Sequence, residues 1–411
     1  MNMPPAFRYR PFRLYWTGHL ISIAGSQMQL WGVFWHLRTL TDRPAVLSAV
    51  GLIRFLPVLL LSLLAGVAAD RFNRRRLALF TQALLALNAL LLGFGTASGR
   101  MTIPFLFAMV GLQSVIAAFD IPARQALIPS LIPREHLANA YSLNSIASKV
   151  GGILGPALSG FVIAGGGISG VYWVNAGSYL AVIVALLAMG EIRQKRETTP
   201  WIPGQALRDI REGIRFILDS PIILSVMILD FFGSFFSSAK TLLPFVARDI
   251  LNTGPVGYGW LSAAQSMGTV LVAFYISQKP HLRRQGLLIC LSVILFGLAT
   301  VLFGCSRLYW LTLLALFLVG IFDGLSSIIR NTTRQLLTPD SMRGRMISIT
   351  QIFFKGGPQL GEVESGLAAQ FLGVPMAIVS GGIGCVIAAL AVIKAVPQVW
   401  KFTGEEKSVE E

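Results

Sequence analysis

The sequence predicts an all-α membrane protein with twelve transmembrane helices in two pseudo-symmetric six-helix bundles. Three observations support this fold class. The chain is 54% hydrophobic and 13% charged, whereas soluble domains carry about 25% charged residues. Apolar segments recur along it, each close to the ~20 residues that cross a ~30 Å hydrocarbon core. In addition, the second half repeats a residue pattern of the first.

Twelve apolar segments are long enough to span a bilayer. They cover 13–38, 45–69, 77–98, 102–124, 139–164, 171–190, 221–247, 257–278, 285–304, 308–329, 345–371 and 374–396. Most of the 34 Lys and Arg residues fall on one side of these spans, and the positive-inside rule places that side and both termini in the cytoplasm. The net charge of +15 therefore indicates topology and contact with anionic lipid. Nucleic-acid binding is not expected, because no basic face is interleaved with exposed aromatics.

The first two spans contain polar and aromatic residues that could face a central cavity. The first span is too long for a signal-peptide core, so we expect it to remain as a helix. It carries Gln27, Trp31 and Trp35, which either line a cavity or pack against a neighbouring helix. The second span carries Arg54 deep in the apolar segment, where it must face protein or water.

The segment GVAADRFNRRR, residues 66–76, predicts a tight cytoplasmic loop between the second and third spans. Gly66 would let two helices approach, and Asp70 follows at a helix end. We expect an ionic latch in which Asp70 meets the N-terminal end of the eleventh span near Arg345. The basic residues that would face the inner acids and lipid are Arg71, Arg74 and Arg75.

The end of the fourth span, FDIPARQALIP at 119–129, recurs near the end of the tenth span. The pairs that recur are Phe119-Asp120 as Phe322-Asp323 and Arg124-Gln125 as Arg334-Gln335, and further on Pro133 aligns with Pro339, Lys149 with Lys355 and Gly155 with Gly361. The chain is therefore a tandem repeat of two six-helix halves. Charges at helix ends usually pair, so we predict ion pairs at an inner gate, with direct substrate contact as the alternative; the gate residues are Asp120, Arg124, Asp323 and Arg334.

Three parts follow from this repeat. Residues 1–190 form the N-terminal bundle, 191–220 a polar cytoplasmic linker with a surface helix, and 221–411 the C-terminal bundle with an acidic tail.

Signatures of enzymes, metals and cofactors are missing from the sequence. The four histidines form no metal-ligand spacing, the three cysteines lie apart in apolar spans, and no phosphate-binding loop occurs. We therefore expect a protein that is not an enzyme and binds no metal or cofactor, so that an ion gradient would supply its energy.

The ionisable residues inside the spans are functional candidates. Lys149 and Lys355 lie about 15 Å into pseudo-equivalent helices and, with Arg54, would make a cationic chamber. Asp230 is the candidate proton carrier, because a buried carboxylate near a cation can exchange a proton; its alternative role is a permanent ion pair with a lysine. Gly151, Gly155, Pro156 and Gly160 would allow close helix approach in the fifth span.

Several of these segments resemble the major facilitator superfamily. Gly66, Asp70, Arg71, Arg74 and Arg75 match its G-x-x-x-D-R-x-x-R-R loop signature, and Gly155-Pro156 with its flanking glycines resembles its helix-5 antiporter motif. FRLYWTGHLIS and FDIPARQALIP look like the branch that includes the enterobactin exporter and macrolide efflux proteins. One departure is that no basic residue lies between Ala108 and Gln113, where many drug antiporters of the superfamily carry an arginine.

The resemblance implies a secondary active transporter that works by alternating access. The expected function is proton-coupled export, as an antiporter, of a small amphipathic molecule such as a siderophore or a drug, with drug resistance as a consequence. The expected location is the bacterial cytoplasmic (inner) membrane, and the expected state is a monomer. The alternatives are a metabolite importer or facilitator of the same fold, or a membrane receptor or lipid-handling protein.

Overall fold

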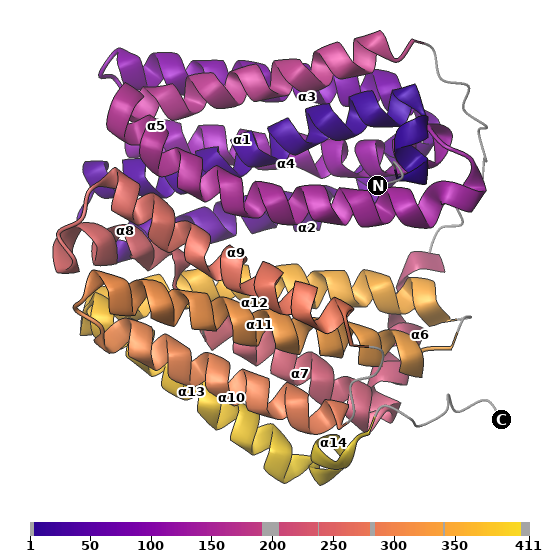
Figure 1. Ribbon diagram of the computed structural model, residues 1–411, viewed down its shortest axis with the longest axis vertical. Helices are drawn as coiled ribbons and strands as arrows, with labels where there is room; N and C mark the ends of the chain where they lie inside the picture. Colours follow the sequence, from indigo (N-terminus) through magenta and orange to yellow (C-terminus); the bar gives the residue numbers. More distant parts are fainter. Residues whose placement is uncertain (1–3, 191–204, 237, 280–283, 340–341, 404–411) are drawn as a thin grey trace. The chain divides into compact units, whose positions relative to one another are not determined.

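The computed structural model describes residues 4–190, 205–236, 238–279, 284–339 and 342–403. Inside some helices only the backbone is described, including 69–71, 205–210, 343–345, 347–349 and 351–355. Every regular element in these ranges is helical (Figure 1). The α-helices are α1 (Arg10–Leu40), α2 (Pro44–Arg71), α3 (Arg74–Ala97), α4 (Ile103–Leu127), α5 (Leu137–Ala188), α6 (Gln205–Asp219), α7 (Pro221–Phe236), α8 (Leu243–Phe245), α9 (Pro255–Ser277), α10 (Gln285–Cys305), α11 (Tyr309–Leu337), α12 (Arg343–Leu372), α13 (Val374–Ala395) and α14 (Pro397–Lys401).

The lengths of these helices confirm an all-α membrane fold. In the described part of the chain, nine helical segments are both long and apolar enough to cross a membrane. One of them includes α5, whose 52 residues hold the predicted spans 139–164 and 171–190. α1 and α12 have the required length, 31 and 30 residues, but are not among these nine.

The two spans within α5 are separated by a break at Gly167. This residue has φ +69° and ψ −178° inside an otherwise helical run. Residues with a side chain rarely adopt positive φ, so glycine permits the sharp change of direction here. The break lies between the two predicted spans.

The predicted span 221–247 is not one continuous helix. α7 ends at Phe236, and helical turns resume at Lys240–Leu242, α8 and the π-turn Val246–Ile250. Two hydrogen bonds connect this interruption to α12. Ser238 Oγ donates to the Pro358 carbonyl (2.8 Å), and Ser365 Oγ donates to the Ser238 carbonyl (2.9 Å). Backbone polar groups at membrane depth need such partners.

The chain folds into two compact units. Unit 1 comprises Met1–Asp42, Ile53–Thr199 and Thr253–Ala263, and unit 2 comprises Arg43–Leu52, Pro200–Asn252 and Ala264–Glu411. The first turns of α2 thus group with unit 2, and the first turns of α9 group with unit 1. In unit 1, α5 packs along α1 and α3; in unit 2, α10 packs along α13 and α11, and α7 along α12 (Figure 1).

Glycines allow the closest approaches between these helices. A Cβ on Gly155 of α5 would lie 2.5 Å from Gln27 Cβ and 2.7 Å from the Ala24 carbonyl oxygen of α1. Gly151, one turn earlier, faces Ile23 and Ala24 in the same way. The predicted close approach at these two glycines is confirmed.

We expect Gly155→Ala to destabilise the protein by about 1–3 kcal/mol, because the added methyl group overlaps the α1 backbone. The measurement is the thermal unfolding midpoint of purified protein in detergent. Gly177→Ala is the matched control, since a Cβ at Gly177 of the same helix meets no described atom within 4 Å. A Gly155→Ala variant as stable as Gly177→Ala would contradict the packing argument.

Candidate functional site

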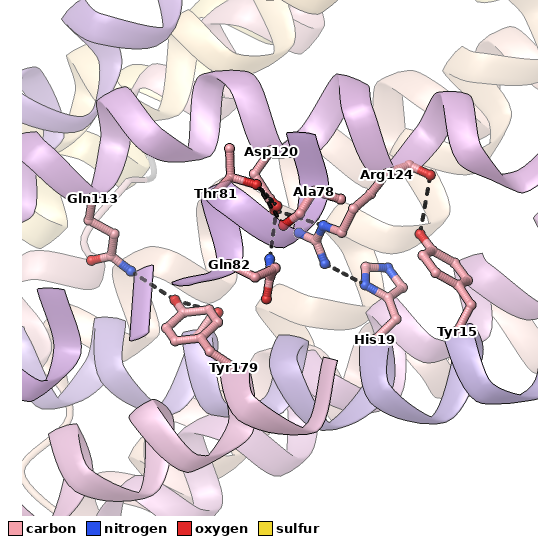
Figure 2. Close-up of polar contacts among 10 residues, drawn as sticks. Tyr15, His19, Ala78, Thr81, Gln82, Gln113, Asp120, Arg124 and Tyr179 are labelled. Carbon is pink, nitrogen blue, oxygen red and sulfur yellow. Dashed lines mark hydrogen bonds and ion pairs between the residues drawn. The ribbon is translucent and has the colours of Figure 1, made fainter. Parts of the chain in front are cut away.

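A buried ion pair on α4 forms the centre of the polar site in unit 1 (Figure 2). Asp120 and Arg124 lie one helical turn apart, and Asp120 Oδ2 is 2.7 Å from Arg124 Nε. The other carboxylate oxygen, Oδ1, accepts hydrogen bonds from Thr81 Oγ1 and Gln82 Nε2 of α3, each at 2.8 Å. The Asp120 side chain is only 1% exposed. These three contacts compensate for burying its charge.

Arg124 also contacts two residues of α1. Its Nη1 lies 2.7 Å from His19 Nδ1, and its carbonyl accepts a hydrogen bond from the Tyr15 hydroxyl at 3.5 Å (Figure 2). The Tyr15 and His19 rings stack with centroids 5.3 Å apart. The cluster of Tyr15, His19, Thr81, Gln82, Asp120 and Arg124 therefore joins α1, α3 and α4, and we call it the N-cluster.

A second network of neutral polar side chains lies between α1, α4 and α5. Asn175 Nδ2 donates to Gln29 Oε1 (2.6 Å), and Gln29 Nε2 donates to Gln113 Oε1 (3.0 Å). Gln113 and Ser26 in turn contact the Tyr179 hydroxyl. Such bonds hold membrane helices together. The sequence analysis did not predict this network, although isolated amides in apolar spans were the available signal.

In unit 2, Asp230 of α7 is held by two arginines of α11. Asp230 Oδ1 lies 2.7 Å from Arg330 Nη2, and Oδ2 lies 3.2 Å from Arg334 Nη1. All three side chains are 5% exposed or less. Arg330 Nη1 further donates to Ser326 Oγ at 2.7 Å. We call Asp230, Arg330 and Arg334 the C-cluster.

The C-cluster bears on two predictions. The described partners of Asp230 are two arginines and not a lysine, and its role as a proton carrier stays a prediction. Arg334 was predicted to take part in ion pairs at an inner gate together with Asp323, and the carboxylate that it contacts is Asp230. Asp323 accepts a long hydrogen bond from Ser327 Oγ at 3.4 Å. The reason is the packing of α7 against α11, which sequence spacing does not reveal. The ion pair of Asp120 with Arg124 is present, but within a single helix.

The two tryptophans predicted to line a cavity are buried instead. Trp31 is 7% and Trp35 is 8% exposed. Their ring centroids lie 6.0 and 5.0 Å from that of Tyr258 on α9, and the Tyr258 hydroxyl donates to the Trp31 carbonyl at 2.9 Å. Both tryptophans therefore pack against α9, and their role at a cavity stays a prediction. Gln27 is half-buried beside Gly155.

The predicted cavity cations differ in their surroundings. Lys149 is exposed on α5, on the same helical face as Ser142 and Ser145. Gly160, about three turns further along that face, contacts Gly259 of α9. Arg54 is half-buried, and no ion-pair partner for it lies among the described side chains. The side chain of Lys355 lies outside the described residues.

Two arginines at the start of α3 bind the ends of other helices. Arg74 Nη1 donates to the Ala126 carbonyl (2.9 Å) near the end of α4, and Arg75 Nε donates to the Leu186 carbonyl (2.7 Å) near the end of α5. Cations are favourable at these C-terminal carbonyls. Arg75 was expected to face acids and lipid; the contacts described for it are with backbone carbonyls of α5. No described atom lies within 4 Å of a Cβ on Gly66, and the close approach expected there stays a prediction, because many side chains around the latch lie outside the described residues.

The latch itself lies outside what the structure describes, because it involves the side chains of Asp70, Arg71 and Arg345. Pro156 of the fifth-span motif is buried within α5, and a Cβ on Gly160 would overlap the Pro255 carbonyl of α9. The close approach predicted for Gly160 is confirmed.

Comparison with known proteins gives the same fold over almost the whole chain. A bacterial homologue of the human lysosomal transporter Spinster superposes with a TM-score of 0.74 at 14% identity, covering 97% of this chain and 98% of that one. A bacterial homologue of the iron transporter ferroportin gives 0.71 at 16% identity, covering 97% and 99%. At these identities the likeness is one of fold.

Sequence relatives are closer. The enterobactin exporter EntS of Shigella boydii serotype 18 is 25% identical over 344 residues, which are 83% of this chain and 80% of the relative. EntS of Escherichia coli O81 matches to the same extent. The helical fold and these relatives define a multi-pass membrane transporter of the major facilitator superfamily, which is not an enzyme. Within it, the chain belongs to the transmembrane secretion effector family, whose model matches residues 3–408.

We expect Asp230→Asn to cost about 3–5 kcal/mol of stability, because it leaves two buried arginines without their counter-charge. Denaturant or thermal unfolding in detergent measures this. Asp219→Asn is the control, since Asp219 forms a solvent-exposed pair with Arg215 at 3.8 Å that is worth about 0–1 kcal/mol. Equal stability of the two variants would show that the C-cluster does not support the fold.

Proposed function

We propose that the protein is a proton-driven exporter of a small amphipathic molecule, working by alternating access. The observation that carries this proposal is the family match over residues 3–408, together with the enterobactin exporters that align with 83% of the chain. The repeat of two six-helix halves supports alternating access, in which one half rocks against the other around a midplane site. The proton gradient is the energy source, and the protein needs no other cofactor.

The unpaired cations support an anionic or hydrogen-bond-rich substrate of the catecholate siderophore class. Lys149 is exposed on a face that also bears the hydroxyls of Ser142 and Ser145. Arg54 is half-buried without a partner among the described side chains. The buried cations of the two clusters, in contrast, already bind carboxylates. Of the three predicted cavity cations, Lys149 and Arg54 are the two with described side chains, and both are available to a ligand in this proposal.

We further propose that α6 contacts anionic lipid on the cytoplasmic side of a bacterial inner membrane. Its Ile217 packs against Ile223, Met227 and Met346, while Arg211 and Arg215 are exposed. A basic, amphipathic helix of this kind is suited to the membrane interface. In this arrangement both termini are cytoplasmic, and the protein functions as a monomer.

Everted membrane vesicles test the function directly. Respiring vesicles acidify their interior, so a proton-coupled exporter should accumulate added enterobactin, and a protonophore should abolish the accumulation. Erythromycin tested in parallel separates a siderophore exporter from a macrolide exporter. Enterobactin equilibration that persists after the gradient is collapsed would indicate a facilitator, and no flux of either compound above empty-vector vesicles would contradict the proposal.

We expect Lys149→Ala to weaken enterobactin binding about tenfold or more, because it removes a charge-assisted contact worth about 1.5–3 kcal/mol. Lys149→Arg should retain most of the affinity. Lys279→Ala, at an exposed lysine near the end of α9, is the control. Binding is measured by tryptophan fluorescence quenching in detergent. Equal losses for all three variants would contradict a specific role for Lys149.

A further inference from the structure

The His19 ring forms a hydrogen bond with the positively charged guanidinium of Arg124. The Arg124 guanidinium has five N–H donors and no acceptor, so at 2.7 Å the Nδ1 atom of His19 must be the acceptor. The ring is therefore neutral and carries its proton on Nε2. A proton added to Nδ1 would place two donors and two positive charges against each other. The arrangement in the structure can exist only while His19 is unprotonated.

The groups around His19 indicate what happens when Arg124 moves. From α4 it meets Arg124 and, behind it, Asp120; from its own helix it meets Tyr15. α5 contributes the neutral phenols Tyr179 and Tyr141 to the same surroundings, and α3 contributes the neutral Thr81 and Gln82. Among the described acids, Asp120 is the one that Arg124 links to His19. A protonated ring could donate to Asp120 in place of Arg124.

The C-cluster contains a corresponding arginine contact, but without a histidine ring. The sequence repeat aligns Arg124 with Arg334, and each arginine reaches a side chain on the first helix of its own half. In the first half this partner is His19, and in the second half it is the carboxylate of Asp230. Histidine changes its charge near neutral pH, whereas Asp230 is a carboxylic acid held between two arginines. Among the described side chains, the aligned arginine thus contacts a histidine in the first half and a carboxylate in the second half.

We propose that His19 is the proton-binding site of the N-terminal bundle. One proton binds Nδ1 when Arg124 leaves it, the Arg124–His19 hydrogen bond is replaced by a His19–Asp120 contact, and the cluster gains one positive charge. When Arg124 returns, the proton leaves. Proton binding then favours the conformation in which Arg124 is displaced, by linkage. The proposal rests on proton coupling as the proposed energy source and names the residue that performs it.

Ring-nitrogen NMR of protein with isotope-labelled histidine tests the chemistry of the site. The chain has four histidines, so His36→Gln, His136→Gln and His281→Gln identify three signals and leave the fourth to His19. At about pH 8 the His19 signal should be that of the neutral Nε2–H tautomer. A doubly protonated ring, or the Nδ1–H tautomer, would overturn the proposal, and this experiment needs no variant of His19.

Spin-label distances across the two bundles test the coupling, in a Cys305→Ser background because Cys305 is exposed. Between about pH 8 and pH 5 the wild type should shift its distance distribution. His19→Gln keeps an acceptor for Arg124 but binds no proton, so the shift should be lost. His36→Gln is the matched control, because His36 is also buried on α1 but bonds to the Tyr172 hydroxyl at 2.9 Å. A shift that survives in His19→Gln, or one lost equally in His36→Gln, would overturn the proposal.

The outcome separates this proposal from the proposed function. Proton-driven enterobactin uptake by His19→Gln vesicles at the wild-type rate would refute His19 as the site and leave proton-coupled export standing. Absence of proton-driven uptake in the wild type would refute the proposed function itself.

Discussion

The cost of burying charge constrains much of this structure. Asp120 and Asp230 are nearly inaccessible, and each is held by arginine and by hydrogen bonds from its own unit. An unpaired charge in such surroundings would cost several kcal/mol. The helices that supply the partners are therefore fixed relative to one another: α1, α3 and α4 in the first unit, and α7 and α11 in the second. The positions of the buried charges determine which helices must remain neighbours.

Close packing through small residues complements these polar contacts. α5 approaches α1 at Gly151 and Gly155, and it meets α9 where Gly160 faces Gly259. Between membrane helices there is little hydrophobic driving force, so van der Waals contact and hydrogen bonds hold them together. The interrupted α7 follows the same rule, since Ser238 exchanges hydrogen bonds with α12 where the helix breaks. Glycine contacts thus hold α5 against its neighbours, while Lys149 on the same helix is an exposed cation.

The candidate site was predictable in part. Asp120 and Arg124 could be paired from their spacing, because residues one turn apart on a helix are neighbours. The partners of Arg334 and of the tryptophans could not be predicted, because they come from helices more than a hundred residues away in the chain. His19 was overlooked for the same reason. A histidine in an apolar span has no distinctive local pattern, and only its contact with Arg124 indicates a role.

The sequence by itself determined the membrane class, the approximate limits of the spans, the tandem repeat and the superfamily. These properties depend on composition, on segment length and on residues close together along the chain. Tertiary structure alone decided that Asp230 binds two arginines, that Trp31 and Trp35 pack on Tyr258, and that Arg74 and Arg75 bind helix ends. The physical reason is that hydrogen bonds and ion pairs act over about 3–4 Å, and packing of distant helices determines which groups come within that range.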